Sequence, residues 1–171
     1  MKNVTKLFVL AILLLSFAVS TFAQVSATAT ATATIVTPIA IVNAGNMNFG
    51  NVAVSASLGT VILAPAGTRT ITGGVTLPVT AGTVSAAHFD VTGTPAYTYA
   101  ITIPSTATTV TSGGNTMTVN AFTSTPVTTG TLGAVSGAQT IDVGATLNVG
   151  ANQASGTYVS GTPFTVTVNY N

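Results

Sequence analysis

Beyond the first six residues, the only charged or imidazole side chains are Arg69, His88, Asp90 and Asp142. His88 and Asp90 are two positions apart in Ala87-His-Phe-Asp-Val91, so in a strand they would share a face and could touch. A hydrolytic triad also needs a Ser or Thr nucleophile held against the imidazole, and no Gly-x-Ser-x-Gly elbow marks one. We therefore interpret His88 and Asp90 as structural residues and expect neither enzymatic activity nor a catalytic residue.

The two carboxylates also make a poor ligand set. Calcium loops place several carboxylates within a few residues, whereas Asp90 and Asp142 are far apart in the sequence. A glycosidase pair is disfavoured because the chain has no Trp to form a sugar platform. Arg69 is expected to form a structural salt bridge with Asp90 or Asp142. We expect no metal and no cofactor.

The low charge excludes several classes of protein. Residues 24–171 carry one Arg and two Asp, and one cation cannot neutralise a run of phosphates, so nucleic-acid binding is excluded. A polybasic membrane patch is excluded for the same reason. With no Cys there is no disulfide framework and no thiolate site.

The first 23 residues are typical of a secretory signal peptide. Lys2 and Lys6 precede an apolar run over residues 7–19, and Thr21-Phe-Ala23 forms a small-x-small exit. The run is shorter than the roughly 20 residues of a transmembrane helix, so we expect cleavage after Ala23 and no membrane span afterwards. The remaining 148 residues, 24–171, suffice for one domain.

The rest of the chain is rich in Thr, Val and Ala and shows no helical apolar stripe. Short alternating runs between Gly, Pro and Asn predict an all-β fold, either a β-sandwich or a barrel. Turns are expected at Gly73-Gly74 and Gly113-Gly114, among other sites. The predicted strands are 34–42, 47–54, 59–63, 75–80, 88–92, 97–103, 116–122, 140–149 and 164–170.

Both ends of this domain alternate strictly. Near the C-terminus one face carries Phe164, Val166, Val168 and Tyr170. Near the N-terminus one face of residues 24–34, the N-terminal arm, carries a second set: Val25, Ala27, Ala29, Ala31 and Ala33. The arm is either an extension that pairs with another chain or a first strand within its own domain. A chain without Lys in this region has little means of protecting sheet edges, so the domain should either cover its edges itself or pair them with another chain.

Several segments together resemble an uncharacterised family of secreted bacterial domains that is similar to chaperone–usher pilin and spore-coat subunits. They are residues 33–41, 48–50, 73–77, 89–93, 99–105, 116–119, 143–147, 149–153 and 164–171, the last reading Phe-Thr-Val-Thr-Val-Asn-Tyr-Asn. The resemblance implies an immunoglobulin-like, pilin-like β-sandwich with an extended N-terminal arm. It also implies that Phe164, Val166, Val168 and Tyr170 form the acceptor edge and the strand that a periplasmic chaperone reads. Many pilins have a Cys pair, and this chain has none.

The sequence thus predicts a signal peptide (1–23), a candidate donor strand (24–34) and a β-sandwich domain (35–171). The expected function is that of a structural subunit of a cell-surface fibre or pilus, supporting adhesion or biofilm. Its partners would be identical or related subunits, with a periplasmic chaperone and an outer-membrane usher. The protein would pass through the periplasm to the cell surface. The alternative is a monomeric adhesin or carbohydrate-binding domain using Tyr97, Tyr99 or Tyr158.

Overall fold

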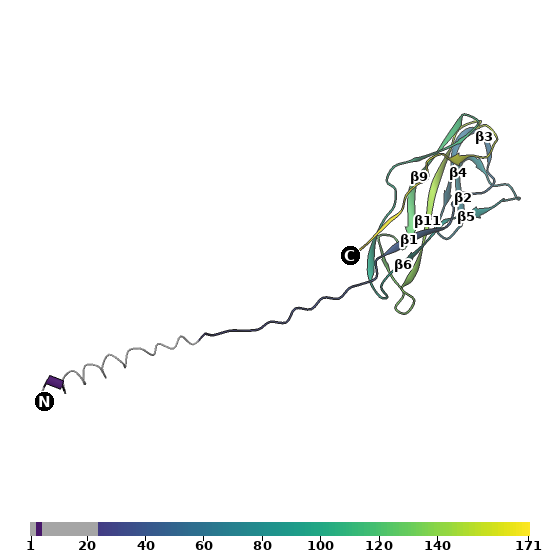
Figure 1. Ribbon diagram of the computed structural model, residues 1–171. Coiled ribbons are helices and arrows are strands. Elements are labelled where there is room, and N and C mark those ends of the chain that lie inside the picture. The colour runs from purple at the N-terminus through teal and green to yellow at the C-terminus, as the bar shows by residue number, and fades with distance from the viewer. Residues whose placement is uncertain (1–2, 5–23) are drawn as a thin grey trace. The chain divides into compact units, whose positions relative to one another are not determined.

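The computed structural model describes residues 3–4 and 24–171, so the predicted signal peptide lies, apart from Asn3 and Val4, outside the described residues. The chain divides into Met1–Ile35 and a compact unit, Val36–Asn171. In the first unit, residues 24–35 are exposed and form no strand. The second unit contains every strand of the described chain (Figure 1). No helix among the described residues is long and apolar enough to cross a membrane.

Thirteen strands make up the compact unit. Their bounds are β1 Ala40–Gly45, β2 Asn48–Phe49, β3 Ala53–Leu63, β4 Arg69–Thr76, β5 Val84–Ser85, β6 Ala87–Thr92, β7 Thr98–Thr102, β8 Thr108–Ser112, β9 Asn115–Thr125, β10 Thr129–Thr131, β11 Ala138–Val149, β12 Val159–Ser160 and β13 Thr167–Tyr170.

The large sheet is organised around β11, and all its pairings are antiparallel. The first half of β11 pairs with β6 and the second half with β3, while β9 runs along its other edge. The change of partner occurs at Gly144, where a Cβ would collide with the Leu63 carbonyl oxygen and with Ala64. A side chain at this position would therefore push the β3 end away from β11.

A smaller sheet in the order β10-β7-β13 lies against the large one. Alternate residues of β6 and β11 point inward, because successive side chains of a strand lie on opposite faces and the apolar ones are buried. Three rings meet at the boundary: Phe164 lies 6.2 Å from Phe89 and 4.9 Å from Phe122, centroid to centroid. Buried apolar residues from both sheets form one core, which makes this all-β fold a sandwich.

Each of the nine predicted strands overlaps an observed one, but β5, β8, β10 and β12 were not predicted, and some bounds and turns differ. The strand predicted over residues 34–42 begins only at Ala40, because residues 24–39 have no strand partner. β8 was not predicted, although the turn at Gly113-Gly114 that joins it to β9 is confirmed. The turn predicted at Gly73-Gly74 is wrong: both glycines lie inside β4, opposite an irregularity in β3. A Cβ at either glycine would strike the β3 backbone, at Leu58 or Ser57, which explains the residue type.

Candidate functional site

His88, Asp90 and Asp142 lie on the outer face of the large sheet, on the paired strands β6 and β11. His88 Nδ1 lies 2.6 Å from Asp142 Oδ1, because the β6–β11 register places these residues directly opposite each other. Asp90, which could have contacted His88, instead accepts a hydrogen bond from the Thr140 hydroxyl at 2.7 Å. The described residues contain no group of three or more potential metal-ligating side chains. Each carboxylate is thus bound to the side chain of the residue that the β6–β11 register places opposite it.

The predicted salt bridge of Arg69 is wrong. Its guanidinium Nη1 donates to two backbone carbonyl oxygens, of Phe49 at 2.5 Å and Asn51 at 3.0 Å. Asn51 is held further by its side-chain amide, which donates to the Thr80 carbonyl at 3.0 Å. Arg69 therefore fixes the segment that follows β2. The guanidinium thus binds backbone carbonyls and forms no ion pair with a described residue.

A cavity of about 1030 Å³ opens on the inner face of the large sheet. We call it the slot. Its floor consists of apolar side chains from β8, β9 and β11, in which Val110 opposes Met117 and Val119 opposes Leu147. Val149 extends the floor along β11. No residue of the three-stranded sheet lines the slot. Val119, Leu147 and Val149 are nevertheless buried, whereas Val110 and Met117 are half-buried.

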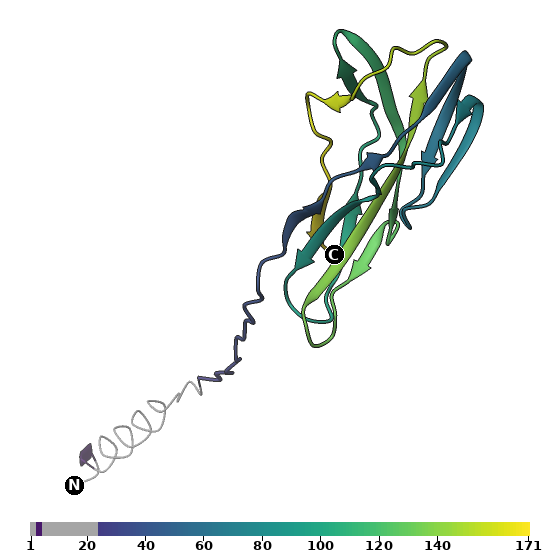
Figure 2. The same cartoon turned by 90° about the vertical axis from the view of Figure 1, so that its right-hand side faces the viewer.

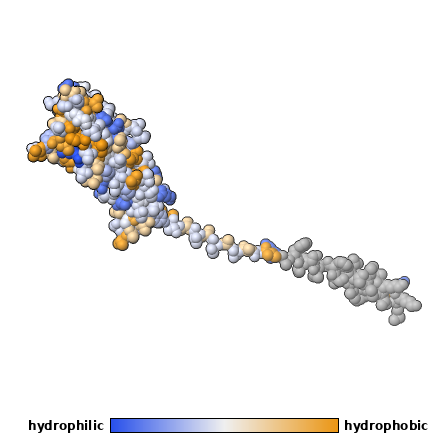
Figure 3. All heavy atoms as spheres, turned by 180° about the vertical axis from the view of Figure 1, so that it is seen from behind, coloured by the Kyte–Doolittle hydropathy of each residue, from blue (hydrophilic) through white to orange (hydrophobic). Residues whose placement is uncertain are grey.

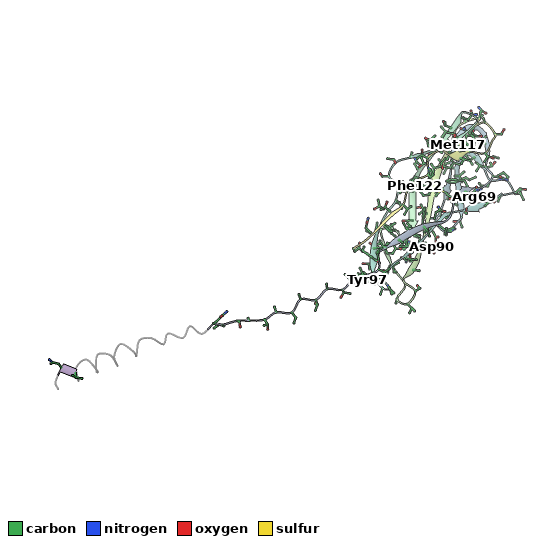
Figure 4. The ribbon with its side chains drawn as sticks, viewed as in Figure 1. Arg69, Asp90, Tyr97, Met117 and Phe122 are labelled. Carbon is green, nitrogen blue, oxygen red and sulfur yellow. The ribbon has the colours of Figure 1, made fainter. Side chains whose placement is uncertain are left out.

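Two chain segments supply most of the remaining lining of the slot, residues 46–54 and residues 153–160. The first is the segment tethered by Arg69. The second is held by Gln153, which donates to the Thr116 carbonyl at 3.2 Å and to the Tyr158 hydroxyl at 2.8 Å. β12, within it, pairs with β8. Both segments are thus attached to the strands on either side of the floor. Figure 4 labels Met117 on the floor and Arg69 on β4.

The lining contains no charged side chain and no His, although its edge carries the amides of Asn43, Asn46, Asn48, Asn51 and Gln153. An uncharged apolar floor cannot stabilise developing charge, so it offers no acid–base or electrophilic chemistry. Its volume is at the upper end of ligand pockets, roughly 300–1,000 Å³. Figure 3 shows apolar side chains gathered on one part of the domain surface. The slot is suited to binding an uncharged, largely apolar segment.

The predicted acceptor residues fall in three environments. Phe164 lines the slot, whereas Val166 and Val168 are buried in the core. Tyr170 is half-buried at the end of β13, which pairs with β7 and lies at the edge of its sheet. The alternation predicted for this segment is confirmed, since the intervening Thr165, Thr167 and Asn169 are exposed.

The predicted donor residues Val25, Ala27, Ala29, Ala31 and Ala33 are all exposed. None of them lies in a strand. Sequence reasoning missed the floor residues Val110, Met117, Val119, Leu147 and Val149 as a site. Their alternation indicates an inward face. The sequence does not show which part of that face lines a cavity.

The Tyr170 hydroxyl joins three parts of the domain. It accepts a hydrogen bond from the Thr94 amide at 2.7 Å and donates to the Thr37 carbonyl at 2.8 Å. Its ring packs edge-on against Tyr97, with centroids 5.5 Å apart. Gly93 makes room for this hydroxyl, which a Cβ would strike. Tyr170 therefore fixes the residues that precede β1.

The tyrosines considered for sugar binding are occupied by internal contacts. Tyr99 is fully buried and donates to Gln139 Oε1 at 2.7 Å, and this burial raises the pKa of its hydroxyl above 10.0. Tyr158 donates to the Ala154 carbonyl at 2.8 Å. Tyr97 is 43% exposed but packs against Tyr170. A buried ring such as Tyr99 cannot serve as a sugar platform.

The fold is an antiparallel β-sandwich with an uncharged slot on the inner face of its large sheet. Residues 39–170 match the family model of the domain of unknown function DUF4402. The chain belongs to this family, as the sequence segments predicted. No curated protein matches the chain, and no solved structure matches it.

Proposed function

We propose that this protein is a structural subunit of a bacterial cell-surface fibre or pilus, in which the N-terminal arm of one subunit fills the slot of the next. The observation that carries the proposal is an unfilled apolar slot in a chain whose exposed arm alternates small apolar and polar residues. A strand inserted in the slot would cover the half-buried floor residues Val110 and Met117. Donor-strand exchange of this kind suits an immunoglobulin-like, pilin-like sandwich.

The composition supports exchange between chains. The slot has no charged lining residue, and the arm has no charged residue, so neither partner would bury an unpaired charge. Each buried methyl contributes on the order of 0.8 kcal/mol, so five arm side chains of about that size give roughly 4 kcal/mol before entropy. Backbone hydrogen bonds along the inserted strand supply the rest of the affinity. A heterologous contact of this type extends into a filament.

Secretion, a periplasmic chaperone and an outer-membrane usher complete the proposed route to the cell surface. Adhesion or biofilm formation is the role proposed for the assembled fibre. In this scheme the chaperone would occupy the slot until the arm of the next subunit replaces it. Of the four proposed acceptor residues, Phe164 lines the slot, three residues before β13 begins.

A denaturing gel without boiling tests the proposal. The chain cleaved after Ala23 should give a ladder that disappears on boiling, and removal of residues 24–34 should leave a single monomer band with β-sheet circular dichroism. A ladder from the truncated chain would show that the arm is not the donor. A folded monomer in both lanes would contradict assembly through the slot and turn attention to the slot as a ligand site.

Point variants separate the two faces of the arm and of β8. Ala29→Asp should abolish the ladder, because an unpaired carboxylate would enter the apolar slot. Thr30→Asp adds the same charge on the opposite face of the arm and should preserve it. On the acceptor side, Val110→Asp should abolish the ladder and its outward neighbour Thr109→Asp should not. Equal effects within either pair would refute the proposed orientation.

A further inference from the structure

Strand β4 presents a free edge that the slot does not use. It is the longest strand of the described chain with a single partner, pairing with β3 alone. Residues Thr70, Ile71, Thr72 and Gly73 are exposed. Figure 2 shows the β3–β4 hairpin at the right-hand margin of the domain. Alternate residues of such a strand point their N–H and C=O groups away from the existing partner, toward a further strand.

The β4 edge has few of the features that normally prevent pairing. It contains no Lys, Pro or acidic residue. Its single cation, Arg69, is directed to the carbonyls of Phe49 and Asn51. The β3 irregularity between Val54 and Gly59, together with the positive φ of Gly73 (66°), ends the regular ladder there. Five residues that pair with β3 without interruption, Arg69–Gly73, therefore remain available, with Gly73 as the last of them.

We propose that two copies of this chain pair side by side through β4, antiparallel, about a twofold axis at Ile71. Residues directly opposite each other in an antiparallel pair have their side chains on the same face of the sheet. When two copies of one strand pair, each residue must therefore lie opposite the same residue of the second copy, or opposite a residue an even number of positions away. Only the register centred on Ile71 uses all five residues. It places Ile71 opposite its own copy, Thr70 opposite Thr72, and Arg69 opposite Gly73.

Each opposed pair in this register is compatible. Ile71, 38% exposed, is covered by the same residue of the second copy. Thr70 and Thr72 form polar cross-strand pairs, and Thr72 already shares a 2.7 Å hydrogen bond with Thr60 of β3. The two Arg69 residues do not oppose each other. An isologous contact of this kind joins subunits laterally and does not depend on the N-terminal arm.

Cysteine cross-linking tests the register, because the chain has no Cys of its own. Ile71→Cys places two thiols directly opposite each other at a Cα separation of about 4.5–5.5 Å, within the range for a disulfide. Under mild oxidation this variant should give a dimer that survives boiling in SDS and disappears with reductant. Thr72→Cys is the matched control: its copies would lie more than about 7 Å apart, so it should remain monomeric. Boiling removes arm-linked polymers from both lanes.

A second experiment covers the case in which Ile71→Cys does not fold. Chains carrying Thr70→Cys and chains carrying Thr72→Cys are oxidised separately and as a mixture, and the mixture should give several-fold more dimer than either alone. Absence of dimer from both the folded Ile71→Cys chain and the mixture would overturn lateral pairing through β4. Dimer from Thr72→Cys alone, equal to that from Ile71→Cys, would overturn the register at Ile71.

Discussion

Replacing Tyr170 with Phe isolates the contribution of a hydroxyl that joins the end of the chain to the residues before β1. The ring and its edge-on packing against Tyr97 remain, while the bonds from the Thr94 amide and to the Thr37 carbonyl are lost. Each such bond contributes a net 0.5–1.5 kcal/mol, so together they are worth about 1–3 kcal/mol. Because the bond to Thr37 is exposed, we expect a loss near 1.5 kcal/mol, or a midpoint lower by about 3–6 °C.

Urea unfolding followed by far-UV circular dichroism measures this loss. The variants are made in the chain lacking residues 24–34, which contain no strand, so that assembly does not contribute to the free energy of unfolding. Tyr97→Phe is the matched control, because the Tyr97 hydroxyl makes no hydrogen bond within residues 24–171 and its loss should change stability by less than about 0.5 kcal/mol. Equal losses from the two variants would refute the assigned role of the Tyr170 hydroxyl.

Gly93→Ala tests the same contact sterically. Its Cβ would displace the Tyr170 hydroxyl, so it should destabilise the wild-type chain more than the Tyr170→Phe chain. A double-mutant cycle measures this coupling, which we expect to exceed 0.5 kcal/mol, a typical lower value for residues in contact. Additive losses would mean that Gly93 does not position the hydroxyl.

Three further perturbations have defined outcomes. Asp142→Asn should cost less than about 1 kcal/mol in urea unfolding at pH 7, because its pair with His88 is partly solvent-exposed (side chains 36% and 43%), and a larger loss would contradict this. Burial raises the pKa of Tyr99 in the folded chain, so its contribution to stability is complete below pH 10 and is lost as pH rises through the folded value. Tyr99→Phe should therefore weaken the alkaline loss of stability in a pH series of unfolding curves, and an unchanged series would refute this. Gly130→Ala should lower the melting temperature strongly, since the Cβ would strike the Tyr99 ring and Gln139 Oε1. A wild-type melting curve would refute that packing.

Alternation in the sequence is sufficient to identify the all-β class and most strands. β11 shows why. Every second residue from Ile141 to Val149 is apolar and buried, namely Ile141, Val143, Ala145, Leu147 and Val149. β4 shows the limit. In the sequence, Gly73 and Gly74 are typical of a turn. In the sheet they make room for the backbone of β3, and the local sequence around them does not show how closely that strand approaches.

The candidate site was predictable in its residue types but not in its arrangement. The apolar faces of β9 and β11 are visible in the sequence. The slot, however, lies where the three-stranded sheet contributes no lining residue, and its walls depend on the paths of residues 46–54 and 153–160. The partner of Arg69 was missed for a related reason. Every residue has a backbone carbonyl, so a sequence does not show which of them a guanidinium will bind. The two carboxylates stand out as partners for Arg69 in the sequence, but in the structure two carbonyls are its partners.

The positions of the few charges connect the two proposed contacts. Asp90, His88 and Asp142 lie on the outer face of the large sheet, and Arg69 is turned to two carbonyl groups. Neither the slot nor the exposed part of β4 therefore presents a charge that could select a partner by attraction or exclude one by repulsion. Selection must rest on side-chain size and on the register of backbone hydrogen bonds. Small Ala residues satisfy the size requirement in the arm, and Ile71 between two threonines sets the register at β4.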